Sequence, residues 1–335
     1  KGGCMKLIDL HCDTFSKMFY ENILDFDSNN LHIDLNKLKK ADSFIQVFAL
    51  FDEKDKSDYK IDNYKKLINF SHKMIKENEE KINFIKSIKD TKDNKQNIIL
   101  SNEDMGSVDN SFDNIKYYYD CGSRMAALTW NYENCIGYPN TMDQSLGLKK
   151  FGREAVEYMN ELGMIVDVSH LNDGGFYDVC DISKYPFIAS HSCARSLCNN
   201  SRNLTDDMIR KIADKGGIIG INFYSLFLSD IDENTKKSLF ALLKAKDYDA
   251  LDKLMSTFES KNEDIVRHIE YIKNIGGSDV IALGSDFDGI SCKLEMKDCS
   301  GMPMLIPILE KRGFNIYEIE KLFYRNALRV FNHVL

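Results

Sequence analysis

The sequence contains few prolines and no stretch with the composition of an interdomain linker. Only four of the 335 residues are proline, and we find neither a low-complexity segment nor an internal repeat. A flexible hinge between domains therefore has little support, although the length alone would allow two domains. We expect residues 5–335 to form one catalytic domain, and we interpret residues 1–4, which precede Met5, as a remnant added for expression.

The cysteines lack the spacing of a disulfide framework or a zinc knuckle. There are nine of them, an odd number, at irregular intervals and without a Cys-x-x-Cys pair. Such usage is typical of a reducing compartment, so we predict a cytoplasmic protein. Cys12 is expected to be a buried structural residue. Cys193 lies two residues after His191, and we keep it open as a thiol near a functional site.

Long apolar runs and basic stripes are also missing. No run approaches the roughly 20 apolar residues that span a bilayer, and no basic segment followed by an apolar stretch opens the chain. The C-terminal residues 331–335 form no apolar tail of the kind that signals a lipid anchor. The formal net charge of −8 argues against nucleic acid or an anionic membrane as a partner. The composition is otherwise that of an ordinary globular enzyme.

Eight short runs rich in β-formers are present, and most of them alternate with segments of helical period such as 148–162 and 205–215. The predicted strands are 5–10, 44–51, 97–102, 125–130, 164–169, 187–190, 217–223 and 280–285. This alternation predicts an α/β fold, a closed (β/α)₈ TIM barrel, with an open doubly wound sheet as the alternative. The connections 52–96 and 224–279 are longer than one helix needs. We expect the second to carry extra helices between 238 and 255.

Histidines and carboxylates recur where the predicted strands end. His11 and Asp13 are two residues apart after the first run, a spacing that turns both side chains to one face of a strand. Similar strand ends carry the remaining candidates, which are Glu103, His170, His191 and Asp286. The carboxyl ends of barrel strands meet at one mouth, so we expect these side chains to converge there. His32, His72, His268 and His333 close no predicted strand.

Three imidazoles and three carboxylates exceed the need of one metal ion. An open catalytic site uses about three protein ligands, so six candidates indicate two divalent ions, and a carboxylate such as Glu103 can bridge them. Two ions about 3.5–4 Å apart can hold a shared hydroxide and polarise a carbonyl. The constellation therefore predicts a hydrolase.

These motifs, taken in order, resemble the membrane (renal) dipeptidase family, peptidase family M19, of the amidohydrolase superfamily. The matching segments are 8–14 (IDLHCDT), 167–170 (DVSH), 189–192 (ASHS), 201–204 (SRNL) and 284–289 (GSDFDG). The resemblance runs from about residue 6 to the C-terminus. It implies a (β/α)₈ TIM barrel of the metal-dependent hydrolase type that holds two zinc ions and cleaves dipeptides, including dipeptides with a D-residue on the C-terminal side.

The resemblance also implies roles for individual residues. It makes His11 and Asp13 ligands of one zinc ion, His170 and His191 ligands of the other, and Glu103 the bridge between them. Asp286 would hold and deprotonate the bridging water and then pass a proton to the leaving amine. In the same way the resemblance makes Arg202, Trp130 and Tyr224 substrate-binding residues, with Arg202 gripping the free carboxylate through its planar fork.

The sequence departs from the family at two places. Where mammalian members carry a Glu-Gly-Gly run, this chain has Glu103-Asp104-Met105, so the match of Glu103 depends on its strand-end position. A substrate-facing histidine of the family is replaced by Trp130, whose indole donates one hydrogen bond and cannot titrate. The substrate range is therefore expected to differ from the mammalian one.

We expect a binuclear zinc dipeptidase that hydrolyses the amide bond of dipeptides through a metal-bridging hydroxide. One alternative is an amidohydrolase that acts on another small amide, a lactam or a lactone. The other is a metal-binding protein without turnover. The expected partner is the dipeptide substrate, with neither nucleic acid nor membrane involved. The sequence leaves the oligomeric state open, with a homodimer as one option.

Overall fold

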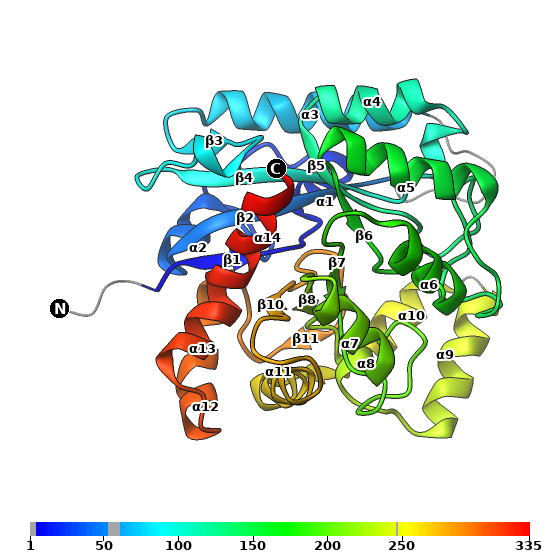
Figure 1. Cartoon of the computed structure of the whole chain (residues 1–335). Helices are drawn as coiled ribbons and strands as arrows, with labels where there is room; N and C mark the ends of the chain where they lie inside the picture. The colour runs from blue at the N-terminus through cyan, green and yellow to red at the C-terminus, as the bar shows by residue number, and fades with distance from the viewer. Residues whose placement is uncertain (1–4, 53–60, 246) are drawn as a thin grey trace.

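Eight parallel strands close into a barrel within the part of the chain that the structure describes (Figure 1). The computed structural model describes residues 5–52, 61–245 and 247–335. The interpretation of residues 1–4 as an expression remnant lies outside this range. The barrel strands are β1 (Leu7–Asp9), β2 (Ser43–Phe51), β4 (Gln96–Glu103), β5 (Ser123–Ala127), β6 (Ile165–Asp167), β7 (Ile188–Ser192), β8 (Ile218–Ile221) and β10 (Ile281–Leu283).

The order of the strands confirms the predicted (β/α)₈ barrel. Neighbours follow the order β2-β1-β10-β8-β7-β6-β5-β4, and β4 pairs again with β2, which closes the ring. A sheet that returns to its first strand excludes the open doubly wound alternative. Each predicted strand run corresponds to one of these strands.

Three further strands were not predicted from the sequence. β3 (Ile82–Phe84) pairs with the beginning of β4, while β9 (Glu259–Ser260) and β11 (Lys293–Leu294) form a small sheet of their own. Each has only two or three residues, too few for a period-2 pattern to stand out.

The helices lie around the barrel and carry ordinary end signals. They are α1 (Thr14–Tyr20), α2 (Leu35–Lys40), α3 (Ile61–Glu77), α4 (Phe112–Asp120), α5 (Lys150–Leu162), α6 (Asp173–Ile182), α7 (Asp206–Asp214), α8 (Ser225–Leu228), α9 (Glu233–Ala245), α10 (Tyr248–Met255), α11 (Asn262–Gly276), α12 (Leu305–Lys311), α13 (Ile316–Glu320) and α14 (Asn326–Val334). The Thr205 hydroxyl caps α7, and Gly163 ends α5 in the left-handed conformation, as caps of these types do. The extra helices expected between 238 and 255 are α9 and α10.

The apolar core has two parts. One fills the space between the sheet and the surrounding helices. The other fills the barrel interior with side chains such as Ile8, Ile99 and Ile188, and Val330 and Phe331 of α14 pack against it. In Figure 1, α14 crosses the near end of the barrel. With that end closed, the opposite end, where the strands terminate, is left for a site.

His268 of α11 is a buried histidine that ties the helix layer to the barrel. Its Nδ1 accepts a hydrogen bond from the backbone N–H of Ala194 (3.1 Å), and its Nε2 donates to the carbonyl of Leu228 (2.9 Å). Because Nδ1 accepts a hydrogen bond, the ring must be neutral. Burial lowers the pKa of His268 from its ordinary 6.5 to about 4, and Arg267 acts in the same direction.

Because of His268, we expect the free energy of unfolding to decrease in mild acid. Between pH 6.5 and about 4 the unfolded chain binds a proton at this position and the folded chain does not, so the free energy of unfolding falls as the pH falls through this window. The shift corresponds to about 3 kcal/mol. Urea unfolding at several pH values should show this loss in the wild type, and His268→Gln should make it smaller. An equal slope in both proteins would show that other groups cause the acid sensitivity.

Candidate metal centre

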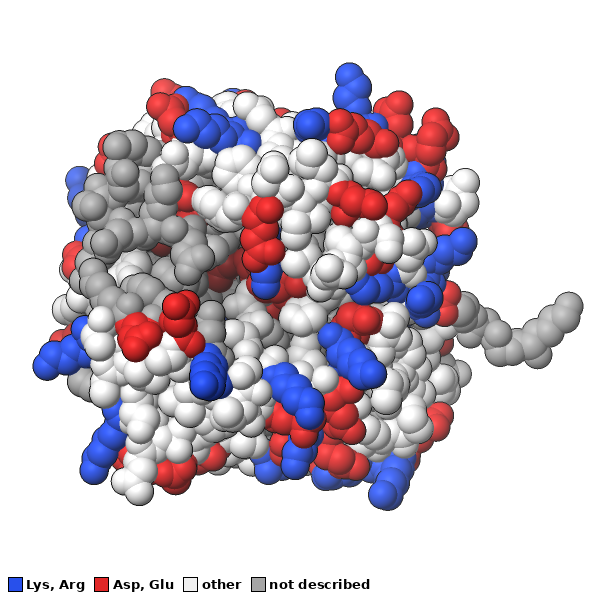
Figure 2. Space-filling model, turned by 180° about the vertical axis from the view of Figure 1, so that it is seen from behind, with Lys and Arg blue, Asp and Glu red and all other residues white. Residues whose placement is uncertain are grey.

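Six side chains converge at the mouth of the barrel. This was predicted from their positions at the ends of strands, which we call the strand-end rule. They come from the ends of five strands, and all are buried: His11, Asp13, Glu103, His170, His191 and Asp286. Glu103 ends β4 and His191 lies within β7, while the others follow β1, β6 or β10 by two to four residues. This face is opposite to α14. Figure 2 shows it hollowed near the centre, with acidic side chains deep in the hollow.

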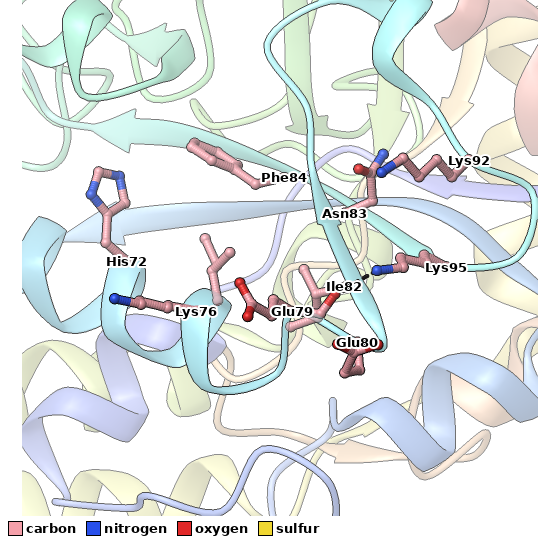
Figure 3. A pocket seen from close by; sticks show the side chains of 10 residues that line it. His72, Lys76, Glu79, Glu80, Ile82, Asn83, Phe84, Lys92 and Lys95 are labelled. Carbon is pink, nitrogen blue, oxygen red and sulfur yellow. Dashed lines mark hydrogen bonds between the residues drawn. The ribbon is translucent and has the colours of Figure 1, made fainter.

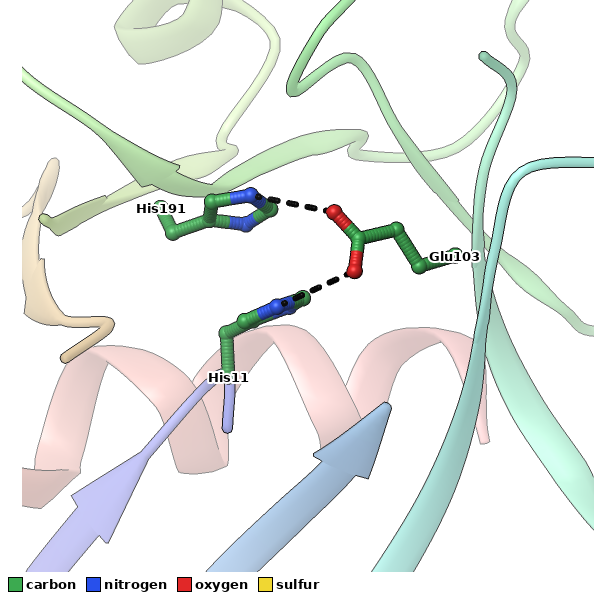
Figure 4. Close-up of side chains that lie close together, drawn as sticks. All are labelled: His11, Glu103 and His191. Carbon is green, nitrogen blue, oxygen red and sulfur yellow. Dashed lines mark ion pairs between the residues drawn. The ribbon is translucent and has the colours of Figure 1, made fainter. Parts of the chain in front are cut away.

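Glu103 lies at the centre of the group. Its Oε2 is 3.5 Å from Nε2 of His11, and its Oε1 is 3.6 Å from Nε2 of His191 (Figure 4). The same Oε1 is 2.9 Å from Nε2 of His170. Each carboxylate oxygen therefore faces a different side of the cluster. This is the arrangement that a bridging carboxylate needs.

His11 joins the remaining carboxylates to the cluster. Its Nε2 lies 3.3 Å from Oδ2 of Asp13 and 3.7 Å from Oδ1 of Asp286. Within the described residues, two groups have ligand atoms all within 4.8 Å of one another: His11 with Glu103 and His191, and His11 with Asp13 and Asp286. Two overlapping groups that share one histidine provide enough ligands for a pair of ions.

The donor atoms of this cluster fit a divalent cation. His11 Nε2 and Asp13 Oδ1 are buried and have no hydrogen-bond partner among the described residues. Such orphaned atoms are costly unless another partner satisfies them. The Nε2 atoms of His170 and His191 face each other at 3.0 Å. Imidazole nitrogens combined with carboxylate oxygens are ligands that zinc accepts.

Burial and local charge set the protonation of the three histidines. Burial lowers the pKa of His170 to about 3, with a further contribution from the charge of Arg202. Burial, followed by the charge of His11, lowers the pKa of His191 well below 6.5. Burial acts on His11 in the same direction, but the charges of Glu103 and Asp13 outweigh it and raise its pKa well above 6.5. Two of the imidazoles are therefore neutral, the form that binds a metal.

The carboxylates repel one another in this buried space. Burial, and then the charge of Glu103, raises the pKa of Asp13 well above its ordinary value. The pKa of Asp286 is also raised, by burial first and then by Glu103, against the charge of His11. Burial raises the pKa of Glu103, but the charge of His11 and the close imidazole nitrogens of His11 and His170 outweigh it, so the pKa is lowered. A bound cation would relieve this repulsion.

The backbone at two of these residues adopts a rarely populated conformation. His170 has a φ of 70° and Asp286 a φ of 63°, in the left-handed region that costs a non-glycine residue about 1–3 kcal/mol. Both residues lie where the chain leaves a strand. Strain of this kind is typical of functional sites, where the surrounding structure holds it in place.

A cavity of about 490 Å³ leads to the cluster. Its wall includes Asp13, Glu103, His170 and Asp286, together with Trp130, Tyr224 and Phe227. Gly289 also lines it, and a Cβ at this position would lie 2.2 Å from Oδ2 of Asp13 and 2.6 Å from Oδ1 of Asp286. The absence of a side chain at Gly289 therefore leaves room for both carboxylates.

Arg202 is buried and only partly satisfied. Its Nη1 donates to the hydroxyl of Ser192 (3.3 Å), while its Nε and Nη2 have no hydrogen-bond partner among the described residues. The guanidinium lies 5.5 Å from the ring centre of Phe227, which lines the cavity. Unused donors of a buried guanidinium favour an anionic ligand.

Trp130 and Tyr224 both form part of the cavity wall. The Trp130 ring contacts Phe51 (4.7 Å between centroids) and lies 6.4 Å from His170. The Tyr224 ring contacts Phe227, and its hydroxyl points to Sδ of Met255 at 3.6 Å. Both positions are compatible with the substrate-binding role that the family resemblance implies.

Sequence reasoning missed residues that hold the candidates in place. Nδ2 of Asn222 donates to Oδ2 of Asp286 (2.8 Å), and Oδ1 of Asn131 lies 3.2 Å from Nδ1 of His170. Ser190 Oγ is 2.7 Å from Nδ1 of His191. Asn222 directly follows β8, so the strand-end rule applied to amides as well as to acids would have found it.

Asp288 has a different environment from Asp286. Its carboxylate accepts hydrogen bonds from the Thr14 hydroxyl (2.6 Å) and from the backbone N–H of His32 (2.7 Å). Its own backbone N–H donates to Nδ1 of His32 (3.0 Å). Asp288 therefore connects the start of α1 with the segment around His32. It does not contact a candidate metal ligand through these bonds.

Cys12 and Cys193 are both buried thiols. Cys193 Sγ donates to the carbonyl of Asn222 (3.3 Å) and Cys12 Sγ to that of Val47 (3.4 Å). Burial raises the pKa of both thiols. Both are therefore protonated packing residues, and Cys193 supplies no reactive thiolate.

A second cavity, of about 500 Å³, lies beside α3 and β3 (Figure 3). Lysines and glutamates line it together with His72 and Phe84. Nε2 of His72 contacts the carbonyl of Cys121 (2.8 Å), and Lys95 donates to the carbonyl of Glu79 (2.6 Å). Among the described residues this cavity contains no group of three metal-ligating side chains.

Comparisons with known proteins agree on one family. The family model described as "Membrane dipeptidase (Peptidase family M19)" matches residues 4–335. Over 238 residues the chain is 36% identical to an uncharacterized protein in the pqqA 5' region of Klebsiella pneumoniae, covering 69% of this chain and 80% of that protein. Over 359 residues it is 28% identical to the uncharacterized dipeptidase C965.12 of Schizosaccharomyces pombe, covering 97% and 79%.

Solved structures share the fold. A metallo peptidase from Rhodobacter sphaeroides, liganded with a phosphinate mimic of the dipeptide L-Ala-D-Ala, superposes with a TM-score of 0.84 at 20% identity, covering 99% of this chain and 100% of that one. The probable dipeptidase PvdM from Pseudomonas aeruginosa gives a TM-score of 0.86 at 21% identity, covering 98% of this chain and 95% of that one.

Among the described helices, none combines the length and the apolar character that crossing a membrane requires.

Proposed function

This chain belongs to the membrane dipeptidase family, peptidase family M19, and we propose that it is a dipeptidase that holds two zinc ions at the barrel mouth. Membership makes it a metal-dependent hydrolase. We further propose that residues 5–335 act as one catalytic domain. The observation that carries the proposal is the buried donor cluster around Glu103, with the orphaned atoms of His11 and Asp13.

The cluster divides naturally between two ions. His11 and Asp13 would hold one, His170 and His191 the other, and Glu103 would serve both, because its two oxygens face different histidines. Zinc ions bound there would supply a nucleophilic hydroxide near neutral pH and polarise the scissile carbonyl.

Asp286 is the proposed general base and acid. Asn222 holds its Oδ2 (2.8 Å), and the backbone N–H of Tyr224 donates to Oδ1 of Asn222 (2.7 Å), which fixes the orientation of that amide. Oδ1 of Asp286 then faces the cluster, 3.7 Å from His11. From this position the carboxylate can accept a proton from the attacking water and return it to the amine that leaves.

Arg202 is the proposed anchor for the free carboxylate of a dipeptide. Its unused Nε and Nη2 donors form the edge of a planar fork that suits a carboxylate. Trp130 and Tyr224 would form walls around the substrate side chains. The indole at position 130 is larger than the imidazole of the family, so the pocket should favour small side chains at that wall.

Arg202→Ala is expected to raise KM about 10- to 100-fold for free dipeptides, because a charge-assisted hydrogen bond is worth about 1.5–3 kcal/mol. C-terminal dipeptide amides should suffer less. Steady-state kinetics on matched acid and amide substrates would measure the difference. Arg210→Ala, which removes an exposed charge on α7, is the control. Equal losses on both substrates would place the anchor elsewhere.

The proposed activity is tested by a substrate screen. The purified protein, supplemented with zinc, should release amino acids from a panel of L,L and L,D dipeptides in a ninhydrin assay, and a chelator should abolish the release. Turnover of lactams or lactones without turnover of any dipeptide would favour the broader amidohydrolase alternative. Bound metal without turnover of either class would favour a binding protein.

A further inference from the structure

A buried chain of polar groups runs from β6 through β7 to the ring of His191. Oδ1 of Asp167 accepts hydrogen bonds from the backbone N–H groups of Ser169 (2.9 Å) and Ser190 (2.9 Å). Its Oδ2 accepts from the Ser190 hydroxyl. The same hydroxyl oxygen lies 2.7 Å from Nδ1 of His191. Asp167, Ser190 and His191 are all buried.

The direction of these bonds follows from the number of protons available. A serine hydroxyl has one hydrogen, and a carboxylate oxygen can only accept. Ser190 therefore donates to Asp167 and must accept at its oxygen from the ring. Nδ1 of His191 then carries the ring hydrogen, and Nε2 keeps its lone pair on the side of the cluster, 3.6 Å from Oε1 of Glu103.

We propose that Asp167 and Ser190 are positioning residues that fix His191 in the tautomer that a metal ligand requires. The inference rests on the proposed metal function, because the lone pair on Nε2 matters only if a cation binds there. A carboxylate that orients a metal-bound histidine usually contacts the ring directly. Here a serine hydroxyl stands between the two groups.

A second aspartate–serine pair in the barrel, Asp9 and Ser285, has the same contacts between strands but no contact with a histidine ring among the described residues. Asp9 accepts hydrogen bonds from the backbone N–H (2.8 Å) and the hydroxyl (2.6 Å) of Ser285, as Asp167 does from Ser190. Ser285 precedes Asp286 as Ser190 precedes His191. The Ser285 hydroxyl, however, contacts the carbonyl of His11 and no imidazole. The contact with the ring is therefore an addition in the Ser190 pair and not a consequence of joining two strands.

The backbone of Ser190 is closely packed, which holds in place the hydrogen-bonded chain Asp167–Ser190–His191, called the relay below. A Cβ added at Gly284 of the β10 end would lie 1.8 Å from the carbonyl oxygen of Ser190, and one at Gly220 of β8 would lie 1.9 Å from it. The two glycines thus allow neighbouring strands to approach the Ser190 backbone closely.

Asp167→Asn gives the sharpest test because it should reverse the direction of the relay. The amide oxygen would take the place of Oδ1, which accepts two backbone N–H groups, so the amide NH₂ would face the Ser190 hydroxyl. Ser190 would then donate to Nδ1 of His191 and move the ring hydrogen to Nε2. The ¹⁵N shifts of the His191 ring in the metal-free protein should change from the Nδ1–H to the Nε2–H tautomer.

Zinc affinity supplies the second readout. Competition with a chelator should show a loss of about 10- to 100-fold for one of the two ions in Asp167→Asn and in Ser190→Ala, the usual cost of losing such a partner. Ser190→Thr keeps the hydroxyl and should restore both the tautomer and the affinity. The matched control is Ser169→Ala. The Ser169 hydroxyl accepts from the backbone N–H of His191 (3.1 Å) and makes a long contact with the Ser190 hydroxyl (3.4 Å), so the variant removes a neighbour of Ser190 but leaves the contact between Ser190 and the ring nitrogen in place.

The outcomes separate this inference from the proposed function. If the wild type bound no zinc, the proposed function would fail, while the ring shifts of the metal-free protein would still report on the relay. If Asp167→Asn kept the Nδ1–H tautomer, or if Ser169→Ala lost as much affinity as Ser190→Ala, the relay would be wrong. If Ser190→Ala did not fold, the comparison of Asp167→Asn with Ser190→Thr would decide.

Discussion

Glu103→Gln is expected to lower the metal content from close to two divalent ions per chain to about one, and to reduce dipeptide hydrolysis about 10³-fold or more. Glu103 offers one oxygen to the side of His11 and the other to the side of His170 and His191. A glutamine keeps one oxygen and turns an NH₂ group, which cannot bind a cation, toward the other side. Lewis-acid polarisation is worth several kcal/mol, and each 1.36 kcal/mol is tenfold in rate.

Elemental analysis after reconstitution with zinc measures this effect directly. His170→Ala should also lower the metal content, because it removes a nitrogen 2.9 Å from Oε1 of Glu103. Glu133→Gln is the matched control, since this glutamate forms a partly exposed pair with Lys149. If the Glu103→Gln protein still bound two ions per chain, Glu103 would not be the bridging ligand. One ion or none in the wild type would refute the binuclear proposal.

Much of the site could be predicted because barrel closure brings strand ends together. The sequence pattern located each strand end to within a few residues, and parallel strands in a closed ring leave their carboxyl ends at one mouth. His11, Glu103 and His191 could therefore be grouped although they are far apart in the chain. The rule requires only that the strands be recognised and that the barrel be closed.

The supporting residues could not be predicted because their roles depend on register between strands. Ser190 touches Asp167 only because β6 and β7 pair with Asp167 opposite Ile188. A serine beside a histidine carries no sign of that partner in the local sequence. Asn222 was missed for another reason: it follows β8 in the expected place, but an amide is not a metal ligand of the usual kind. His268 closes no strand, and its ties to Ala194 and Leu228 arise from helix packing.

Backbone conformation at the site was also hidden from sequence reasoning. His170 and Asp286 were expected directly after their strands, and both turn into the left-handed region at that point. Aspartate and histidine adopt that region more often than most residues other than glycine, but the local sequence does not show at which positions they do so. The surrounding contacts impose it. One such contact is the hydrogen bond from the backbone N–H of Asp286 to the carbonyl of His11 (3.1 Å).

Asp286→Asn is expected to reduce kcat by about 10²–10⁴-fold, the usual contribution of a general acid or base, while both metal ions stay bound. The NH₂ of Asn222 faces position 286, so the new carbonyl oxygen would turn toward it. The new NH₂, which cannot take up a proton, would then face the cluster. Asp288→Asn is the matched comparison: it weakens the bonds to Thr14 or His32 and should cost about 1–3 kcal/mol of unfolding free energy with a small change in kcat. Saturation kinetics, metal analysis and urea unfolding on both variants test the pair. A large kcat loss in Asp288→Asn with a nearly normal Asp286→Asn would reverse the assignment of the catalytic carboxylate.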